Sequence, residues 1–312
     1  MLKVLFMGTP EFARVILEGL VTQYDVIGVV TQPDKVVGRK KELKPSPVKE
    51  FATTHNIKVY QPQKIRKEAD ELIALKPDLI VTAAYGQIIG TNLLDAPKYH
   101  CINVHGSLLP KYRGGAPIQR AIMNGEKETG ITIMYMSKGM DSGDILAQRT
   151  VKIDDCETTT TLFSKMAIAG RDLLLESLPD ILSGKIKPLP QKEEDVTFGY
   201  NLTREEERID FTKDAQAVDC QIRALLDEPG AYFNFIGFPE EKDLIKVLEA
   251  KPSLAKVDAI PGTVVSVNKQ YFTIACGNHT AIQIYKVKPF GKKAMDAQSF
   301  INGAMRRYYK GE

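Results

Sequence analysis

The residues with the clearest chemical potential are Asn103 and His105, followed further along the chain by Asp141. The short, apolar and β-branched run at residues 101–104 predicts a β-strand that ends at Gly106. Alternate side chains of a strand project to the same face, so the amide and the imidazole can point at one spot. An amide, an imidazole and a carboxylate can together stabilise charge on an acyl oxygen and move protons.

Asp141 lies in a turn rich in glycine and aspartate, after a second strand-like run at residues 131–136. That run predicts a strand that returns the chain to the same edge of a sheet. Each of the three polar residues alone is also typical of a buried strand end or of an aspartate that caps a loop. Their combination with the Ser-Leu-Leu-Pro turn at residues 107–110 favours a catalytic centre.

The first half of the chain alternates strand-like and helix-like segments, which is typical of a Rossmann-like, doubly wound α/β sheet with mostly parallel strands. Ligands of such a sheet bind at the carboxyl ends of its strands. The turns at residues 8–10, 85–87 and 105–107 fall at these ends. The predicted strands are residues 2–7, 26–31, 79–83 and 101–104, and the predicted helices are residues 11–20, 68–75, 116–123 and 158–178.

The last hundred residues have a different texture, with short β-rich segments bounded by Gly, Pro and Asn. These segments predict a smaller C-terminal β-barrel domain of the oligonucleotide-binding (OB-like) type. They are residues 231–236, 243–249, 262–267, 271–275 and 281–287. We therefore expect a catalytic domain at residues 1–182, a polar linker at residues 183–208 and the β-barrel domain at residues 209–312.

The composition limits the class of protein. Forty-two basic and 39 acidic residues give a net charge of only +3, too small to predict nucleic-acid binding by itself. The four cysteines form no Cys-x-x-Cys pair, which argues against a zinc site or a disulfide framework and fits a reducing cytoplasm. The sequence predicts neither a signal peptide nor a membrane span. We expect a monomer, because no coiled coil or apolar stripe stands out.

The motif formed by Asn103, His105, the turn at residues 107–110 and Asp141 resembles the active-site signature of enzymes that use 10-formyltetrahydrofolate as a formyl donor. The resemblance implies this folate as a co-substrate and an amine as the acceptor. Asn103 and His105 would donate hydrogen bonds to the developing oxyanion. Asp141 would orient or charge His105, or relay a proton through water, and the spacing leaves these roles open. Direct transfer needs no covalent intermediate, no metal and no nucleotide cofactor.

The same resemblance predicts the walls of the substrate sites. The folate-binding residues would be Ser107, Leu108, Leu109 and Pro110 on one wall and Tyr85, Gly86, Gln87 and Ile88 on the other. The turn after the first strand lacks Gly-x-Gly-x-x-Gly, which argues against NAD or FAD. In the resembled family this turn packs near the acceptor, with Phe12 at the wall, although a core phenylalanine explains the residue equally well.

A long basic segment at residues 33–48 follows the second predicted strand. A long basic loop beside an active site suits a phosphate backbone, while an ordinary solvated loop is the alternative. Its motif Gly38-Arg39-Lys40-Lys41 resembles the loop with which the methionyl-tRNA formyltransferase branch of the family contacts transfer RNA. The resemblance implies that Arg39, Lys40 and Lys41 contact the acceptor.

A second basic concentration lies near the C-terminus and includes Lys292, Lys293, Arg306 and Arg307. On a small β-barrel, such a cluster predicts a nucleic-acid footprint. The resemblance to the methionyl-tRNA formyltransferase branch covers nearly the whole chain, although residues 225–228 depart from the more aromatic form expected there. It implies transfer of a formyl group to methionyl-initiator tRNA for translation initiation.

Three alternatives use or keep the same centre: an amino-sugar formyltransferase, a formyltetrahydrofolate hydrolase, and a binding protein without catalysis. The intact catalytic trio argues against the last of these. An amino-sugar formyltransferase would not need two basic surfaces. In a hydrolase, water would replace the amine and the C-terminal β-barrel would have no obvious purpose. Salt dependence of acceptor binding separates a polyanion from a sugar nucleotide, because a polyanion releases more counterions.

Overall fold

The computed structural model describes residues 2–37 and 42–308. The chain forms two compact units: the first contains residues 1–118, 128–153 and 162–201, and the second contains residues 119–127, 154–161 and 202–312. The units therefore interleave along the sequence. The sequence predicted a catalytic domain, a linker and a β-barrel domain as three continuous ranges. That division remains a prediction.

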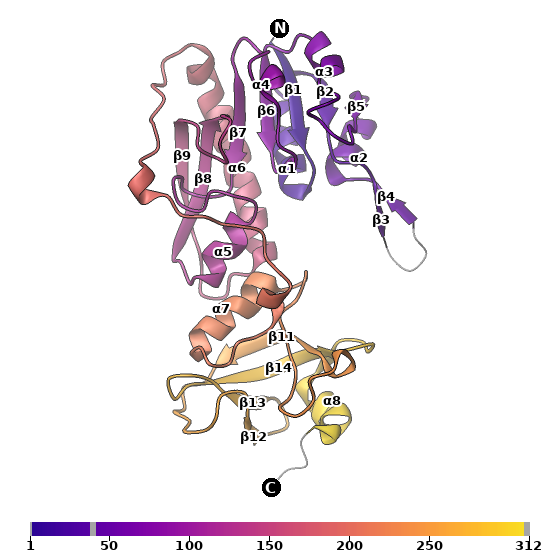
Figure 1. Cartoon of the computed structure of the whole chain (residues 1–312), viewed down its shortest axis with the longest axis vertical. Coiled ribbons are helices and arrows are strands. Elements are labelled where there is room, and N and C mark those ends of the chain that lie inside the picture. The colour runs from indigo at the N-terminus through magenta and orange to yellow at the C-terminus, as the bar shows by residue number, and fades with distance from the viewer. Residues whose placement is uncertain (1, 38–41, 309–312) are drawn as a thin grey trace. The chain divides into compact units, whose positions relative to one another are not determined.

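The first unit is built on a seven-stranded sheet in the order β5-β2-β1-β6-β7-β8-β9 (Figure 1). Neighbouring strands from β5 to β7 run parallel, whereas β8 and β9 are antiparallel to their neighbours. Every residue of β6 is buried, as expected for a strand covered on both faces. The predicted mostly parallel α/β fold is confirmed. The strands are β1 (Lys3–Gly8), β2 (Asp25–Val30), β5 (Val59–Tyr60), β6 (Leu79–Ala83), β7 (Cys101–His105), β8 (Glu128–Tyr135) and β9 (Ile145–Lys152).

Amphipathic helices connect these strands. In α1, Phe12, Ile16 and Leu17 are buried while Glu11 and Glu18 face solvent, which is the pattern of a helix packed on a core. The helices are α1 (Glu11–Leu20), α2 (Pro47–Thr54), α3 (Asp70–Ala74), α4 (Thr91–Leu94), α5 (Pro117–Met123) and α6 (Thr159–Leu182). The sequence correctly predicted α1, α3, α5 and α6, with ends displaced by a few residues.

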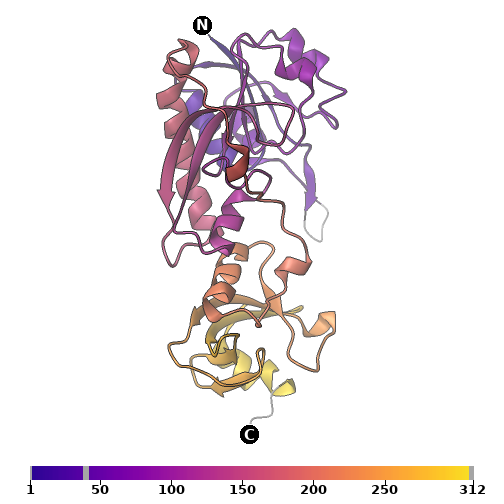
Figure 2. The same ribbon diagram turned by 60° about the vertical axis from the view of Figure 1, so that its left-hand side comes forward.

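The long basic segment after β2 contains a small hairpin, which the sequence did not predict. β3 (Lys35–Val37) and β4 (Glu42–Lys44) pair antiparallel and stand away from the sheet in both views (Figures 1 and 2). The hairpin leads into α2, whose first turn is capped by Ser46: the serine Oγ accepts a hydrogen bond from the backbone N–H of Lys49 at 3.1 Å.

The second unit contains an antiparallel sheet in the order β10-β11-β14-β13-β12, with β15 paired to β14. All five strands expected in this part of the chain are present. They are β10 (Tyr232–Phe233), β11 (Ile245–Pro252), β12 (Val264–Val267), β13 (Phe272–Ala275) and β14 (Ala281–Pro289), joined by the short β15 (Met295–Asp296). The smaller C-terminal β domain is therefore confirmed.

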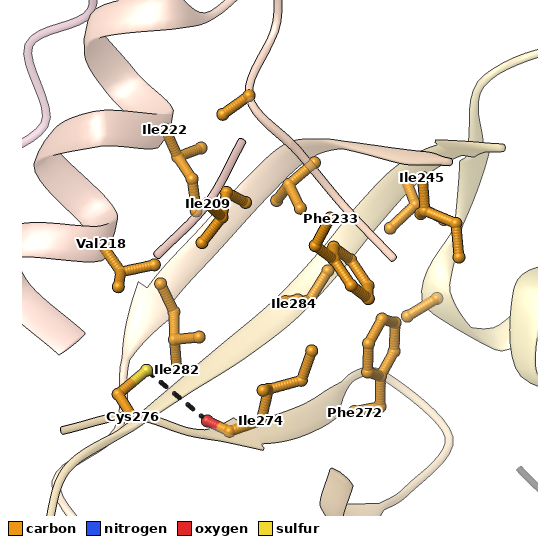
Figure 3. Close-up of a cluster of buried hydrophobic side chains, with 14 of the residues drawn as sticks. Ile209, Val218, Ile222, Phe233, Ile245, Phe272, Ile274, Cys276, Ile282 and Ile284 are labelled. Atoms are coloured by element: carbon orange, nitrogen blue, oxygen red, sulfur yellow. Dashed lines mark hydrogen bonds between the residues drawn. The ribbon is translucent and has the colours of Figure 1, made fainter. Parts of the chain in front are cut away.

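One helix covers a face of this sheet. α7 (Ala215–Leu225) turns Val218 and Ile222 toward the buried side chains of β14, including Ile282 (Figure 3). Phe233 and Phe272 complete the same apolar core. The remaining elements of the described residues are α8 (Ala297–Asn302) and the 3-10 helices η1 (Glu193–Asp195), η2 (Glu205–Glu207), η3 (Glu241–Asp243) and η4 (Ala304–Arg307). In the described ranges, no helix has both the length and the apolar character needed to cross a membrane.

Candidate active site

The end of β7 places the two polar residues that the sequence singled out. β7 lies between β6 and β8, with Asn103 beside Thr82 and His105 beside Thr132. Asn103 is half-buried and His105 is only 5% exposed. Burial of a polar side chain costs free energy unless the side chain is hydrogen-bonded. The hydrogen-bond partners of Asn103 and His105 therefore define the site.

The structure brings His105 and Asp141 together. The imidazole Nδ1 lies 3.6 Å from the Asp141 Oδ2, beyond a normal hydrogen bond but within the range of an ion contact. The other ring nitrogen, Nε2, lies 3.0 Å from the backbone carbonyl oxygen of Tyr112. A carbonyl oxygen only accepts, so Nε2 carries a hydrogen in this arrangement and Nδ1 is the atom that faces the carboxylate.

Asp141 is held in place by the backbone around it. Its φ of 46° lies in the left-handed region, and its Oδ2 accepts a hydrogen bond from the Gly114 N–H at 2.9 Å. The side-chain amide of Gln191 donates to the carbonyl oxygens of Asp141 and Gly143, at 2.8 and 2.7 Å. A Cβ at Gly143 would lie 1.8 Å from the carbonyl oxygen of Tyr135, so only glycine fits this turn.

Thr82 fixes the amide of Asn103. The Thr82 Oγ1 lies 2.7 Å from the Asn103 Oδ1 and 3.2 Å from the carbonyl oxygen of Ile102. With Oδ1 accepting from the hydroxyl, the Nδ2 end of the amide keeps its hydrogens for another partner. Asn103 therefore offers a donor at the carboxyl end of β7, which is where ligands of such sheets bind.

The turn after β7 is fastened to the neighbouring strands. Thr132 Oγ1 donates to the carbonyl of Ser107 at 2.7 Å and accepts from the Leu109 N–H at 3.0 Å. Gln148 donates to the Leu109 carbonyl at 2.8 Å. Leu109 is buried, Leu108 is half-exposed, and the Leu109–Pro110 peptide is cis. Of the two leucines, Leu108 is thus the one with free surface for a ligand.

The segment predicted as the second wall of the folate pocket follows β6. The carbonyl oxygen of Tyr85 accepts hydrogen bonds from Thr9 Oγ1 at 3.1 Å and from Gln32 Nε2 at 2.9 Å. Gly86 has a φ of +89°, a conformation that favours glycine. Gln87 accepts from a backbone N–H at 2.9 Å, and Ile88 is 69% exposed. The structure thus fixes the backbone here and leaves one apolar side chain open.

The phenol of Tyr85 is buried at the same place. Desolvation, together with the negative charge of Glu68, raises the pKa of Tyr85 to about 12. The hydroxyl therefore stays protonated at neutral pH. It has no hydrogen-bond partner among the described residues.

The residues predicted to contact the acceptor fall in different places. Phe12 is 5% exposed, and its ring packs edge-on against Phe163 of α6 with centroids 6.5 Å apart. It therefore lies in the core of the first unit. Arg39, Lys40 and Lys41 lie outside the described residues.

The predicted C-terminal contacts belong to the second unit. Lys292, Lys293 and Arg306 are exposed. Arg307 pairs with Asp243: its Nη2 lies 2.9 Å from Oδ1 of this carboxylate, which is only 2% exposed. The hydroxyl of Tyr308 donates to the same oxygen at 3.1 Å. Arg307 thus holds the C-terminal segment to the second unit through the buried carboxylate of Asp243.

Several supporting residues were missed by sequence reasoning. Thr82 could have been found from the sequence, because it is a polar residue inside an otherwise apolar predicted strand. That strand neighbours the one that carries Asn103 and His105. Gln191 could not, because it lies in a polar stretch that reads as a linker. In the described part of the chain, no three His, Cys, Asp or Glu side chains cluster in a way that could hold a metal ion.

Comparisons with known proteins identify the family of the chain. Two family profiles match the chain, Formyl transferase over residues 2–178 and Formyl transferase, C-terminal domain, over residues 201–305. A methionyl-tRNA formyltransferase of Bacillus thuringiensis subsp. konkukian is 49% identical over 306 residues, covering 97% of this chain and 96% of the relative. A Bacillus cereus protein of the same name, from strain AH820, matches to the same extent.

Solved structures share the fold at lower identity. An N-formyltransferase from Helicobacter canadensis, in complex with folinic acid and dTDP-3-aminofucose, is 20% identical with a TM-score of 0.69, covering 91% of this chain and 99% of that one. HypX from Aquifex aeolicus in complex with tetrahydrofolic acid is also 20% identical, with a TM-score of 0.64, covering 97% of this chain and 47% of that one. At such identity the likeness shows the fold alone.

Both profiles match in chain order, and relatives at 49% identity cover 97% of the chain. The chain therefore belongs to the formyl transferase family, in its methionyl-tRNA formyltransferase group.

Proposed function

We propose that this enzyme transfers the formyl group of 10-formyltetrahydrofolate to the amino group of methionyl-initiator tRNA, and so supplies formyl-methionyl-tRNA for translation initiation in the cytoplasm. The observation that carries the proposal is the Asn103, His105 and Asp141 arrangement in a chain 49% identical to proteins named for this reaction. Formyltetrahydrofolate is a co-substrate in this account, and neither a metal nor a nucleotide cofactor takes part.

The donor would lie at the carboxyl ends of β6 and β7. Its ring system would contact Leu108 and Ile88, which both keep exposed apolar surface. Backbone groups of Tyr85, Gly86, Gln87, Ser107, Leu109 and Pro110 would complete the walls. The folate compounds named with two solved structures of this fold support a folate site.

The reaction begins when the lone pair of the methionyl amine attacks the formyl carbon. The carbonyl electrons move to the formyl oxygen, which then carries negative charge. The Nδ2 hydrogens of Asn103 are the donors placed to stabilise it, because Thr82 holds the other end of the amide. Collapse of the intermediate breaks the bond to N10, which takes up a proton while the former amine loses one.

His105 and Asp141 would serve these proton movements. The Asp141 carboxylate lies 3.6 Å from Nδ1, while the Nε2–H points at the fixed carbonyl of Tyr112. A formyl oxygen that approaches His105 would compete with the Tyr112 carbonyl for this hydrogen. The imidazole is therefore placed to donate to the oxyanion, with Asp141 beside its other ring nitrogen.

The RNA would contact two basic regions. Arg39, Lys40 and Lys41 belong to the segment that joins β3 to β4, and Lys292, Lys293 and Arg306 are exposed in the second unit. Phosphate contacts by such residues give affinity without reading the base sequence. Arg39→Ala is expected to raise the KM for charged RNA more than the KM for the folate.

We propose that the enzyme acts as a monomer.

The test is to mix the purified enzyme with 10-formyltetrahydrofolate and methionine-charged initiator tRNA, hydrolyse the ester and measure N-formylmethionine. The proposal predicts product only with charged RNA. If the folate is consumed without formylmethionine, the donor site is right and the acceptor is wrong. Acceptor binding that hardly changes between low and high salt would favour an amino-sugar acceptor.

A further inference from the structure

One short backbone segment contacts both His105 and Asp141. The carbonyl oxygen of Tyr112 lies 3.0 Å from His105 Nε2, and the N–H of Gly114 donates a hydrogen bond to Asp141 Oδ2 at 2.9 Å. Arg113 lies between these two contacts in the chain. The mechanism described above uses the two flanking backbone groups and leaves the side chain of Arg113 without a role.

The backbone of this segment is unusual on both sides of Arg113. Tyr112 has a φ of 60° and Gly114 a φ of +125°. A left-handed conformation costs free energy in a residue such as tyrosine and persists only where the surroundings enforce it. A Cβ at Gly114 would lie 2.9 Å from the carbonyl oxygen of Gly199, so this glycine is needed for the close approach of the two backbones. Contacts from residues distant in the sequence therefore hold the segment.

Part of that support comes from the stretch that the sequence predicted as a linker. The N–H of Arg113 donates to the carbonyl oxygen of Thr197 at 2.9 Å, and its carbonyl oxygen accepts from the N–H of Gly199 at 2.8 Å. The N–H of Tyr112 donates to Thr197 Oγ1 at 2.9 Å. Backbone pairing of this kind fixes where Arg113 stands, and thereby where its side chain begins.

The side chain of Arg113 is buried and fully directed at the same stretch. It is only 6% exposed, and its Nε donates to Gln191 Oε1 at 3.0 Å. Its Nη2 donates to Glu193 Oε1, also at 3.0 Å, but the Glu193 side chain is 77% exposed. An ion pair with a carboxylate in water adds little stability. The contact with Gln191 is therefore the one that gives the buried guanidinium a specific purpose.

That contact decides which way the Gln191 amide points. The Nε2 end of the amide donates to the carbonyl oxygens of Asp141 and Gly143. If the amide turned over, its oxygen would face two carbonyl oxygens and its hydrogens would face the guanidinium. The guanidinium of Arg113 can only donate, so it selects the orientation in which Gln191 holds the Asp141 turn.

We infer that Arg113 is a positioning residue for formyl transfer, which acts on Asp141 through the side-chain amide of Gln191. Among the contacts of the described residues, its guanidinium reaches neither Asp141 nor His105, so it is not a catalytic group. The inference rests on the proposed roles of His105 and Asp141 and extends them. It predicts a loss of kcat without a loss of substrate affinity.

The test measures N-formylmethionine formed from methionine-charged initiator tRNA by variants of Arg113. Arg113→Met fills the buried space but has no N–H to donate, and is expected to lower kcat about tenfold, because small misplacements of catalytic groups are costly. The KM for the folate should stay near the wild-type value. Arg113→Lys keeps one donor group but loses the planar fork, and is expected to lower kcat only about threefold.

A double variant tests whether Arg113 acts through Gln191. Arg113→Met/Gln191→Leu is expected to lose about tenfold in kcat, as each single variant does, because both changes remove one and the same hydrogen bond. Two independent roles would multiply to about a hundredfold loss. Such multiplication would overturn the inference.

Two further variants are controls. Glu193→Gln removes the exposed negative charge that pairs with Arg113 and should leave kcat within about twofold. Arg149→Met removes an arginine of the first unit that pairs with Glu176, and should also leave kcat within about twofold. If Glu193→Gln lowers kcat as far as Arg113→Met does, the ion pair and not Gln191 is responsible, and the inference is wrong.

The outcomes separate this inference from the proposed function. Folate affinity measured on the same preparations shows whether each variant is folded, and if Arg113→Met is not, wild-type kcat in Arg113→Lys overturns the inference. If His105→Ala and Asp141→Asn lose turnover while folded Arg113→Met keeps the wild-type kcat, only the positioning role is wrong. If His105→Ala and Asp141→Asn also turn over at the wild-type rate, the proposed site itself fails.

Discussion

The side-chain amide of Gln191 donates hydrogen bonds to the carbonyl oxygens of Asp141 and Gly143, at 2.8 and 2.7 Å. Gln191, which lies in a stretch predicted as a linker, therefore holds the backbone of the turn at both Asp141 and Gly143. Asp141 has a left-handed φ of 46°, a conformation that costs free energy in a non-glycine residue and persists only where the surroundings enforce it. Gln191 is part of that enforcement.

Replacing Gln191 with leucine should therefore loosen the turn without touching either substrate. We expect kcat to fall about tenfold, because small misplacements of catalytic groups are costly, while the folate KM stays near the wild-type value. Lys192→Ala, at the exposed neighbouring position, is the control. A Gln191→Leu enzyme with wild-type kcat would show that Asp141 holds its position unaided.

Thr82 offers a second test of positioning. Thr82→Val keeps the shape of the side chain and removes the hydroxyl that holds Asn103 Oδ1. The amide can then turn its oxygen toward the developing oxyanion, and we expect kcat to fall about threefold to tenfold, a fraction of the loss for removing an oxyanion donor outright. Thr82→Ser should recover most of the rate. If serine and valine behave alike, the hydroxyl does not orient the amide.

The ion pair between Arg120 and Glu206 predicts a specific pH dependence of stability. The arginine lowers the pKa of Glu206 to about 2 from its usual 4.5. A lowered carboxyl pKa stabilises the folded state above pH 4.5, and this contribution is lost as the pH falls toward 2.

Glu206→Gln should accordingly reduce the free energy of unfolding at pH 7 by about 1 kcal/mol, a modest value because the carboxylate is partly exposed. Denaturant titrations between pH 7 and pH 3 should show the difference from wild type shrinking as the pH falls below 4.5. The control is Glu207→Gln, since in the described ranges Glu207 has no ion pair. A difference that stays constant across this range would contradict the assignment.

Arg307 and Arg306 should differ when each is replaced with alanine. Among the described residues, Arg307→Ala leaves the buried carboxylate of Asp243 with the Tyr308 hydroxyl as its side-chain partner, and we expect a loss of about 1–3 kcal/mol in unfolding free energy. Arg306→Ala, at an exposed position, should leave stability almost unchanged. Equal stability of the two variants would mean that the Asp243 pair does not anchor the C-terminal segment.

The sequence predicted the elements that carry strong periodicity. The prediction found the buried strands β1, β6 and β7 and the amphipathic helix α1. Buried positions require apolar residues, and these give a pattern that can be read from the sequence. β9 and the β3–β4 hairpin were not predicted, since β9 alternates exposed polar residues and the hairpin is short and charged. β9 forms by pairing with β8, and the hairpin forms by pairing of two adjacent three-residue strands, so a residue pattern within either segment is a weak signal.

The same distinction applies to the site. The spacing of Asn103 and His105 on one strand predicted that their side chains point at the same spot. The strand before Asp141 predicted that this residue returns to the same sheet edge. The contacts of His105 with the Tyr112 carbonyl and of Asp141 with Gln191 could not be predicted. Both depend on irregular backbone, which no periodic pattern describes.

The most direct test measures formyl transfer to methionyl-initiator tRNA by Asn103→Ala, His105→Ala and Asp141→Asn, with folate binding measured on the same preparations. The account predicts that each variant binds the folate within a few-fold of wild type and loses about 10²-fold or more in turnover. Turnover within twofold of wild type in any of the three would remove that residue from the mechanism. Near-normal turnover in all three would contradict the assignment of the active site.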